Sequence, residues 1–149
     1  MTLSKPSIWA AAAEGRTEDA VRLLENGADV HETNSAGTAA LHYAAEKGDH
    51  VVVRLLLQKG AGVNVRTHEG SSPLHEASAG GHNEVVNMLL DNGADISLKT
   101  RNRTTPLHSA AEGRQDQVVQ SLLDKGAAAH AITRFMPSPI TISLRTCSV

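Results

Sequence analysis

Three histidines in near-identical surroundings are the residues of this chain best suited to chemistry. His42, His75 and His108 each follow a leucine, in the stretches TAALHYAA, SSPLHEAS and TTPLHSAA. An imidazole close to hydroxyl groups resembles a general base beside a nucleophile, and histidine is also a common metal ligand. Acid–base, nucleophilic and metal-assisted chemistry are therefore the first hypotheses to weigh.

The spacing of the three histidines argues against these hypotheses. The intervals are equal, since 75 − 42 = 33 and 108 − 75 = 33, so the histidines occupy equivalent positions in successive units. Stacked helices lie about 8–10 Å apart, whereas a metal ion holds its ligands within about 2–2.2 Å. No cysteine or carboxylate recurs beside them, and the period contains no nucleophile elbow or glycine-rich phosphate loop. We therefore expect no catalytic residue, no metal and no cofactor. Each histidine is expected to bond backbone groups that fix one repeat to the next.

A second series of residues shows the same period. Gly27, Gly60, Gly93 and Gly126 recur every 33 residues, each just after a segment rich in leucine. Within one period, Ser72 can cap a short helix that has Pro73 in its first position and ends near residues 80–81. A second helix over about 83–91 carries Val85, Val86, Leu89 and Leu90 on one side, and glycine suits its left-handed end. A polar loop follows. Such a unit must stack on its neighbours to bury its apolar side.

These motifs resemble the ankyrin repeat family. The matching segments are TPLH at 105–108, SPLH at 72–75, the VV and LL pairs of the second helices, and the GAD or GA segments at 27–29, 60–61, 93–95 and 126–127. The resemblance covers about 6–130 and implies an all-α solenoid of stacked helix–turn–helix units with β-hairpin-like loops. It indicates a single domain, 1–149, with about four repeats at 6–36, 37–69, 70–102 and 103–135. For 136–149 two expectations stand: a truncated fifth repeat, because Pro139 falls in register, or a disordered tail.

Several positions depart from the pattern. Trp9 replaces the histidine in the first repeat, and Asp19 occupies a valine position of its second helix, which suits a terminal unit with one open face. Ala39 removes the cap of the second repeat, so its first helix is expected to fray sooner than that of the fourth. Arg103 and Arg114 replace glycines. If the backbone keeps a positive φ there, arginine costs roughly 1 kcal/mol, and a shifted turn is the alternative.

The bulk properties limit the range of partners and locations. The chain has 149 residues, a formal net charge of −2 and a single cysteine, Cys147. This charge predicts no general attraction to nucleic acid or an anionic membrane. There is no apolar run of membrane length, no recognisable signal peptide and no possibility of an internal disulfide. We expect a monomer in the cytoplasm or nucleus.

The resemblance implies a non-enzymatic module that binds another protein, as an adaptor, inhibitor or subunit, through a concave face of loop tips and first helices. Two alternatives remain open at this stage: an enzyme or small-ligand-binding protein that uses the groove, and a purely structural spacer. Among the candidate binding residues Tyr43 is the favoured hot spot. A basic cluster near the C-terminal half favours an acidic patch on the partner. The candidate partner-binding residues are Ser35, Ala36, Thr38, Tyr43, Glu46, Lys47, His68, Glu69, Ser71, Glu76, Arg101, Asn102, Thr104, Ser109 and Glu112.

Overall fold

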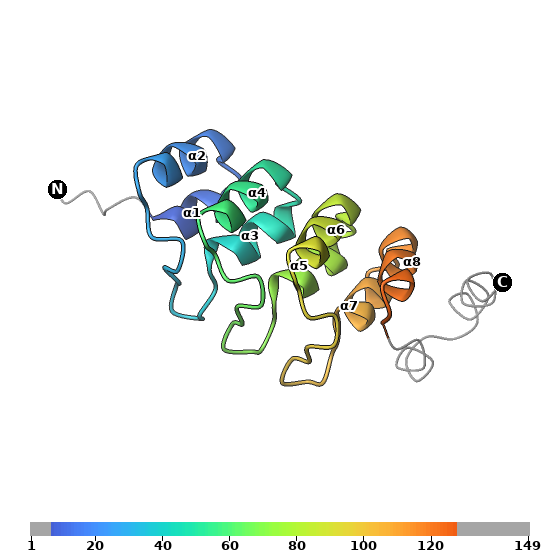
Figure 1. Cartoon of the computed structure of the whole chain (residues 1–149). Helices are drawn as coiled ribbons and strands as arrows, with labels where there is room; N and C mark the ends of the chain where they lie inside the picture. Colours follow the sequence, from blue (N-terminus) through green and yellow to red (C-terminus); the bar gives the residue numbers. More distant parts are fainter. Residues whose placement is uncertain (1–6, 128–149) are drawn as a thin grey trace.

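The computed structural model describes residues 7–127 and forms eight helices within that range (Figure 1). They are α1 (Ile8–Ala13), α2 (Thr17–Glu25), α3 (Ala40–Lys47), α4 (His50–Gln58), α5 (Pro73–Gly80), α6 (Asn83–Asp91), α7 (Pro106–Glu112) and α8 (Asp116–Asp124). These helices form four pairs, as the sequence predicts. Both expectations for 136–149 lie outside the described residues.

The helix pairs stack side by side in a single row. The odd-numbered helices contact one another in chain order and form one layer, and the even-numbered helices form a second layer (Figure 1). Long loops project from one side of this double layer, each leading into the first helix of the next pair. The main contacts therefore link each repeat to its immediate neighbours, which is the architecture of a solenoid.

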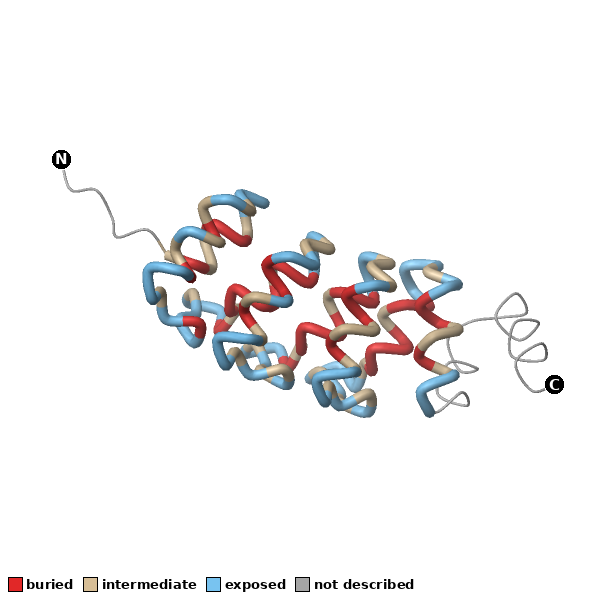
Figure 2. Tube along the Cα trace, turned by 45° about the horizontal axis from the view of Figure 1, so that its top comes forward, coloured by how far each residue is buried: buried red, intermediate tan, exposed pale blue. Residues whose placement is uncertain are grey.

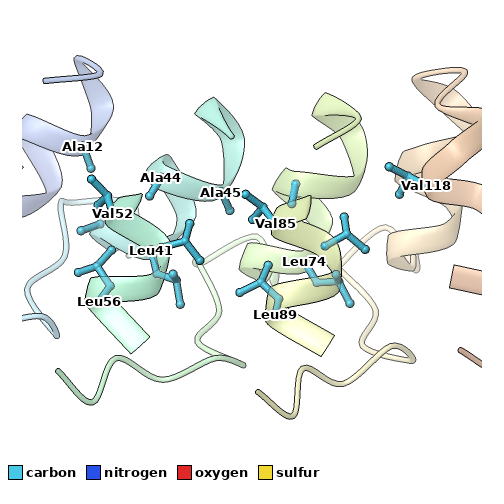
Figure 3. Packing of buried hydrophobic residues seen from close by; sticks show 14 of the residues in the cluster. Ala12, Leu41, Ala44, Ala45, Val52, Leu56, Leu74, Val85, Leu89 and Val118 are labelled. Carbon is cyan, nitrogen blue, oxygen red and sulfur yellow. The ribbon is translucent and has the colours of Figure 1, made fainter. Parts of the chain in front are cut away.

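The core is a cluster of aliphatic side chains that runs through all four repeats. Figure 2 shows buried residues in every helix pair of the row. In the outer layer, Val52, Val53 and Leu56 of α4 are buried, and the same three positions are buried in α6 and α8. Figure 3 shows Val52 beside Ala12, an alanine of the preceding repeat's first helix, and the pattern recurs one repeat later. Burying one valine or leucine contributes about 1.5–3 kcal/mol. Because part of that burial comes from the neighbour, the repeats stabilise each other.

The helix starts follow the predicted pattern. At α7, the Thr105 hydroxyl accepts a bond of 3.3 Å from the His108 amide, as a capping residue should. At α3, Ala39 provides no side-chain cap. At α5, Ser72 is the N-cap residue, as predicted, and forms a capping box with His75. The Ser72 hydroxyl also lies 2.8 Å from the His75 Nδ1 atom.

The two arginines that replace glycines keep the left-handed backbone. Arg103 has a φ of 64° and Arg114 a φ of 56°, so the turn is not shifted at either position. The inner repeats have an additional reason for glycine. A Cβ atom at Gly81 would lie 2.2 Å from the side-chain oxygen of Gln115, and one at Gly48 would lie 2.3 Å from a ring nitrogen of His82. In those repeats the next helix pair occupies the space that a side chain would need.

The first repeat ends the stack with a polar face. Asp19 lies within 3.2 Å of Arg16 and within 3.9 Å of Arg22, and all three side chains are substantially exposed. Ion pairs in such positions contribute little stability, but their charged groups keep this face polar and hydrated. The open face predicted at this position is confirmed. None of the helices over residues 7–127 combines the length and the apolar character that crossing a membrane requires.

Candidate partner-binding surface

Three projecting loops, which we call fingers 1, 2 and 3, cover residues 31–38, 64–71 and 97–104. Each is closed at its tip by a backbone bond of 2.9–3.1 Å, namely from Asn34 to Thr38, from Thr67 to Ser71 and from Thr100 to Thr104. A side-chain oxygen at the first residue of each pair accepts a further bond from the backbone N–H of the second. These bonds produce the hairpin-like shape predicted from the family resemblance.

The fingers are also bonded to one another. The His68 amide donates to the Ala36 carbonyl, and the Arg101 amide donates to the Glu69 carbonyl, each at 2.9 Å. The Arg66 guanidinium donates both to the Gly70 carbonyl, at 3.3 Å, and to the Lys99 carbonyl of finger 3. The spacing of the tips is thus set by bonds within the fold. A surface held in this way loses less conformational entropy when it binds.

His75 is the clearest case of the repeated histidine. Its Nε2–H donates to the Thr104 carbonyl of finger 3 at 2.9 Å, so Nδ1 is free to accept from the Ser72 amide at 3.1 Å and from the Ser72 hydroxyl at 2.8 Å. Only 3 % of the residue is exposed. Burial lowers the pKa of His75 below its ordinary value of 6.5, and Arg66 lowers it further, while the bond to Thr104 opposes the shift. The ring is therefore neutral.

His42 makes the corresponding set of bonds one repeat earlier. Its Nδ1 atom accepts from the Ala39 amide at 3.0 Å, and its Nε2–H is shared between the carbonyls of Ser71, at 3.0 Å, and Val65, at 3.1 Å. Burial again lowers the pKa of His42, against the effect of the two carbonyls. His108 accepts from the Thr105 amide at 3.1 Å. The predicted bonds from the histidine to the next repeat are therefore confirmed for His42 and His75.

The candidate binding residues lie on the fingers and on the first helices, and none of the fifteen is buried. The partly buried ones are Thr38, Tyr43, Ser71, Glu76, Thr104 and Ser109, and the exposed ones are Ser35, Ala36, Glu46, Lys47, His68, Glu69, Arg101, Asn102 and Glu112. The structure therefore brings them to the surface on one set of elements. Their part in binding stays a prediction.

Tyr43 is held in place by two residues that the sequence analysis did not single out as binding residues. The Asn34 side-chain amide donates to the tyrosine hydroxyl at 2.8 Å. Trp9 stacks on the tyrosine ring, with 6.5 Å between ring centroids and 30° between the planes. Trp9, at a position where the later repeats have histidine, was a sequence signal that could have indicated this contact. The 33-residue period predicts neither the contact with Trp9 nor the bond from Asn34. Tyr43 is consequently a rigid, partly exposed aromatic side chain.

Glu76 carries a carboxylate in an unfavourable environment beside finger 2. The Ser71 hydroxyl donates to it at 2.5 Å. Burial raises the pKa of Glu76, the Ser71 bond lowers it, and repulsion from Glu46 raises it again. Two carboxylates on adjacent first helices, α3 and α5, therefore repel each other on this face. A cation placed between them would relieve that repulsion.

The fingers differ in charge along the stack. Finger 1 contains Glu32 as its only charged side chain, and finger 2 contains Arg66 and Glu69. Finger 3 has three basic side chains, Lys99, Arg101 and Arg103, and no acidic one. The formal charges are thus −1, 0 and +3. Within the described range, the basic side chains of finger 3 form no ion pair.

Two features of the described residues bear on the enzymatic alternative. A pocket of about 110 Å³ lies between the first two repeats, lined by Val30, His31, Ala39, Leu41, Ala61, Gly62 and Val65. Ligand sites for small molecules are usually about 300–1,000 Å³, and this lining is mostly apolar. Across residues 7–127, no three histidine, cysteine or carboxylate side chains gather in a group able to hold a metal ion.

Comparison with known proteins extends the internal repeat pattern to a family. A family model of ankyrin repeats in three copies matches residues 8–100, and a model of a single ankyrin repeat matches residues 102–134. A search among curated proteins finds no significant match. The matched ranges include the four helix pairs, fingers 1 and 2, and finger 3 apart from Arg101.

Proposed function

The chain belongs to the ankyrin repeat family, whose repeats generally serve as protein–protein interaction modules, and from this premise we propose that it binds a partner protein through its fingers and first helices. The partner-bound chain acts as an adaptor, an inhibitor or a subunit and performs no catalysis of its own. The surface meant here consists of fingers 1–3 and the exposed sides of α3, α5 and α7, which we call the concave surface.

The observation that supports this proposal most directly is the rigid display of non-repeating side chains. Bonds between the fingers set the positions of the tips, while Ser35, His68, Glu69, Arg101 and Asn102 at the tips are exposed. Tyr43 adds an aromatic side chain held by Trp9 and Asn34. Tyrosine is enriched among the residues that dominate binding energies. A pre-formed surface with such an anchor suits recognition of another protein.

The setting we propose follows from composition and charge. The single cysteine, which cannot form an internal disulfide, favours the reducing environment of the cytoplasm or nucleus. A net charge of −2 favours a protein partner over nucleic acid or an anionic membrane. We also propose that the chain is a monomer when it meets its partner.

Site-specific photo-cross-linking in the native cell tests the function. A photoreactive amino acid at Lys47, which is exposed on α3 close to Tyr43, should capture a specific protein. The matched control places the same group at Val51, an exposed apolar residue of the outer helix α4. Capture from Lys47 should decrease when Tyr43 is also replaced by alanine. Identical captured proteins at both positions would contradict the proposal, as would capture from Lys47 that does not depend on Tyr43.

A further inference from the structure

Finger 3 concentrates positive charge that the fold does not use. Lys99, Arg101 and Arg103 alternate along the tip, and within residues 7–127 none of their side chains forms an ion pair or a hydrogen bond. Finger 1 carries a formal charge of −1 and finger 2 a charge of zero. Three like charges on one short loop repel each other, so their presence is unfavourable for the isolated chain.

The backbone of finger 3 provides a second, independent observation. Arg103 is held at a φ of 64°, where the inner fingers have Gly37 and Gly70 at φ values of 77° and 84°. Arginine in this region is less stable than glycine. Residues that the surrounding structure holds in such conformations cluster at active sites, ligand clamps and switch regions. The Arg103 side chain is exposed and forms no ion pair within residues 7–127, so no ion pair offsets this cost.

The neighbouring helices restrict what can occupy this surface. Glu46 on α3, Glu76 on α5 and Glu112 on α7 carry carboxylates on the concave surface, and Glu46 already repels Glu76. A polyanion such as a nucleic acid strand, lying along the groove, would meet these carboxylates as well as the basic finger. A peptide can place opposite charges at its two ends and so complement both parts.

Building on the proposed function, we propose that the partner of the concave surface contributes a segment of mixed charge. Its acidic side chains contact Lys99, Arg101 and Arg103 on finger 3, and a lysine or arginine further along the segment faces Glu46 and Glu76. This arrangement places the acidic end of the partner at the tip of finger 3, away from Glu112 on α7, and its basic end over α3 and α5. It therefore fixes the direction in which the segment lies.

A display library of random dodecapeptides, selected on the full chain at about 0.15 M salt, provides the probe. Recovered peptides should be enriched in aspartate or glutamate at one end and in lysine or arginine at the other. Synthetic copies of these peptides then allow affinities to be measured by fluorescence anisotropy. The affinity should decrease as salt is raised, because exposed ion pairs are screened.

Two variants separate finger 3 from general charge effects. The triple variant K99E/R101E/R103E should weaken the selected peptides by about tenfold or more, which is the sum expected for three exposed ion pairs. The control is R114E, which removes the same type of side chain from another left-handed position, at the opposite end of α7. It should leave the affinity within about twofold. Circular dichroism confirms that both variants are folded.

The outcomes distinguish this inference from the proposed function. Peptides that bind the concave surface without charge enrichment, or that bind the triple variant equally well, would overturn the inference and leave the proposed function standing. Tighter binding of single-stranded DNA or of phosphatidylserine vesicles than of any peptide would overturn it as well. A library that yields no binder to the folded chain would also count against it, while cross-linking at Lys47 tests the proposed function separately.

Discussion

Replacing Arg114 by glycine measures the backbone strain in the turn between α7 and α8. A left-handed backbone costs a residue other than glycine about 1–2 kcal/mol, and the φ of 56° at Arg114 lies in that region. Glycine also makes the unfolded chain more flexible, which offsets about 0.4–1 kcal/mol of the gain. The expected net stabilisation is therefore about 0.5–1 kcal/mol. For a chain of this size the melting temperature should increase by about 2–4 °C.

The matched variants isolate the cause of this gain. Arg114→Ala removes the exposed side chain but keeps the strain, so its stability should equal that of the natural chain within about 0.5 kcal/mol. The reverse change, Gly81→Arg in the third repeat, should cost about 2–3 kcal/mol. It introduces strain at a φ of 74°, and its Cβ atom also displaces Gln115, which donates to the Ala79 carbonyl at 3.3 Å.

Urea denaturation followed by far-UV circular dichroism gives the free energy of unfolding for each variant. The reasoning is refuted if Arg114→Gly has the same stability as Arg114→Ala with an unchanged slope, since the left-handed turn would then carry no strain. An equal gain from both variants would show that the arginine side chain, and not its backbone, is the unfavourable element.

The remaining predictions concern the buried polar groups and the first helices. His75→Ala should lower the free energy of unfolding by about 2–4 kcal/mol, because it leaves the Ser72 amide without its acceptor. The control His68→Ala, at an exposed tip, should change the free energy of unfolding by less than about 0.5 kcal/mol. Equal urea midpoints for the two variants would contradict this. Lowering the pH from about 7 to 5.5 should destabilise the chain, because the pKa values of His42 and His75 are lowered in the folded chain, which therefore binds fewer protons than the unfolded chain below pH 6.5. The free energy of unfolding should decrease by at most about 1.4 kcal/mol per pH unit for each histidine. A free energy of unfolding that does not change in this pH window would disprove the prediction. Ser78→Ala should stabilise the chain by about 1 kcal/mol, because the Ser78 hydroxyl is fully buried without a hydrogen-bond partner. A lower melting temperature of this variant would indicate that the hydroxyl forms a hydrogen bond in solution. Amide exchange should be faster in the first turn of α3 than in that of α7, because α3 lacks a side-chain cap, and the opposite order in native-state exchange would show that packing outweighs the cap.

The repeat period predicted the scaffold closely because it is a local and recurring signal. The expected helix over about 83–91 is α6, Asn83–Asp91. The glycines after the second helices have positive φ values, as predicted. Ser72 is the N-cap residue of α5, as predicted, but the contact of its hydroxyl with the ring of His75 was not predicted. Such a contact depends on the position of a side chain and not on the sequence pattern.

The candidate surface was predictable in position but not in its internal contacts. Its residues were found by removing the repeating framework, which leaves the irregular positions. The bonds that hold Tyr43 come from Trp9 in the preceding repeat and from Asn34 in finger 1. Because neither residue recurs at these positions, the period contains no information about the pairing. The shape of the turns at Arg103 and Arg114 also needed the structure, since strain and a shifted turn were both compatible with the sequence.

The bonds between neighbouring fingers have a consequence for how this chain can change its specificity. Two of them join main-chain atoms, Ala36 to His68 and Glu69 to Arg101, so these two persist with any residue other than proline at positions 68 and 101. The third bond, from the Arg66 guanidinium to finger 3, needs its own side chain, which lies outside the tips. Substitution at the tips can therefore alter the chemistry offered to a partner while the distance between tips stays constant. New partners are accessible to this scaffold by point mutation alone, without any redesign of the core that carries the tips.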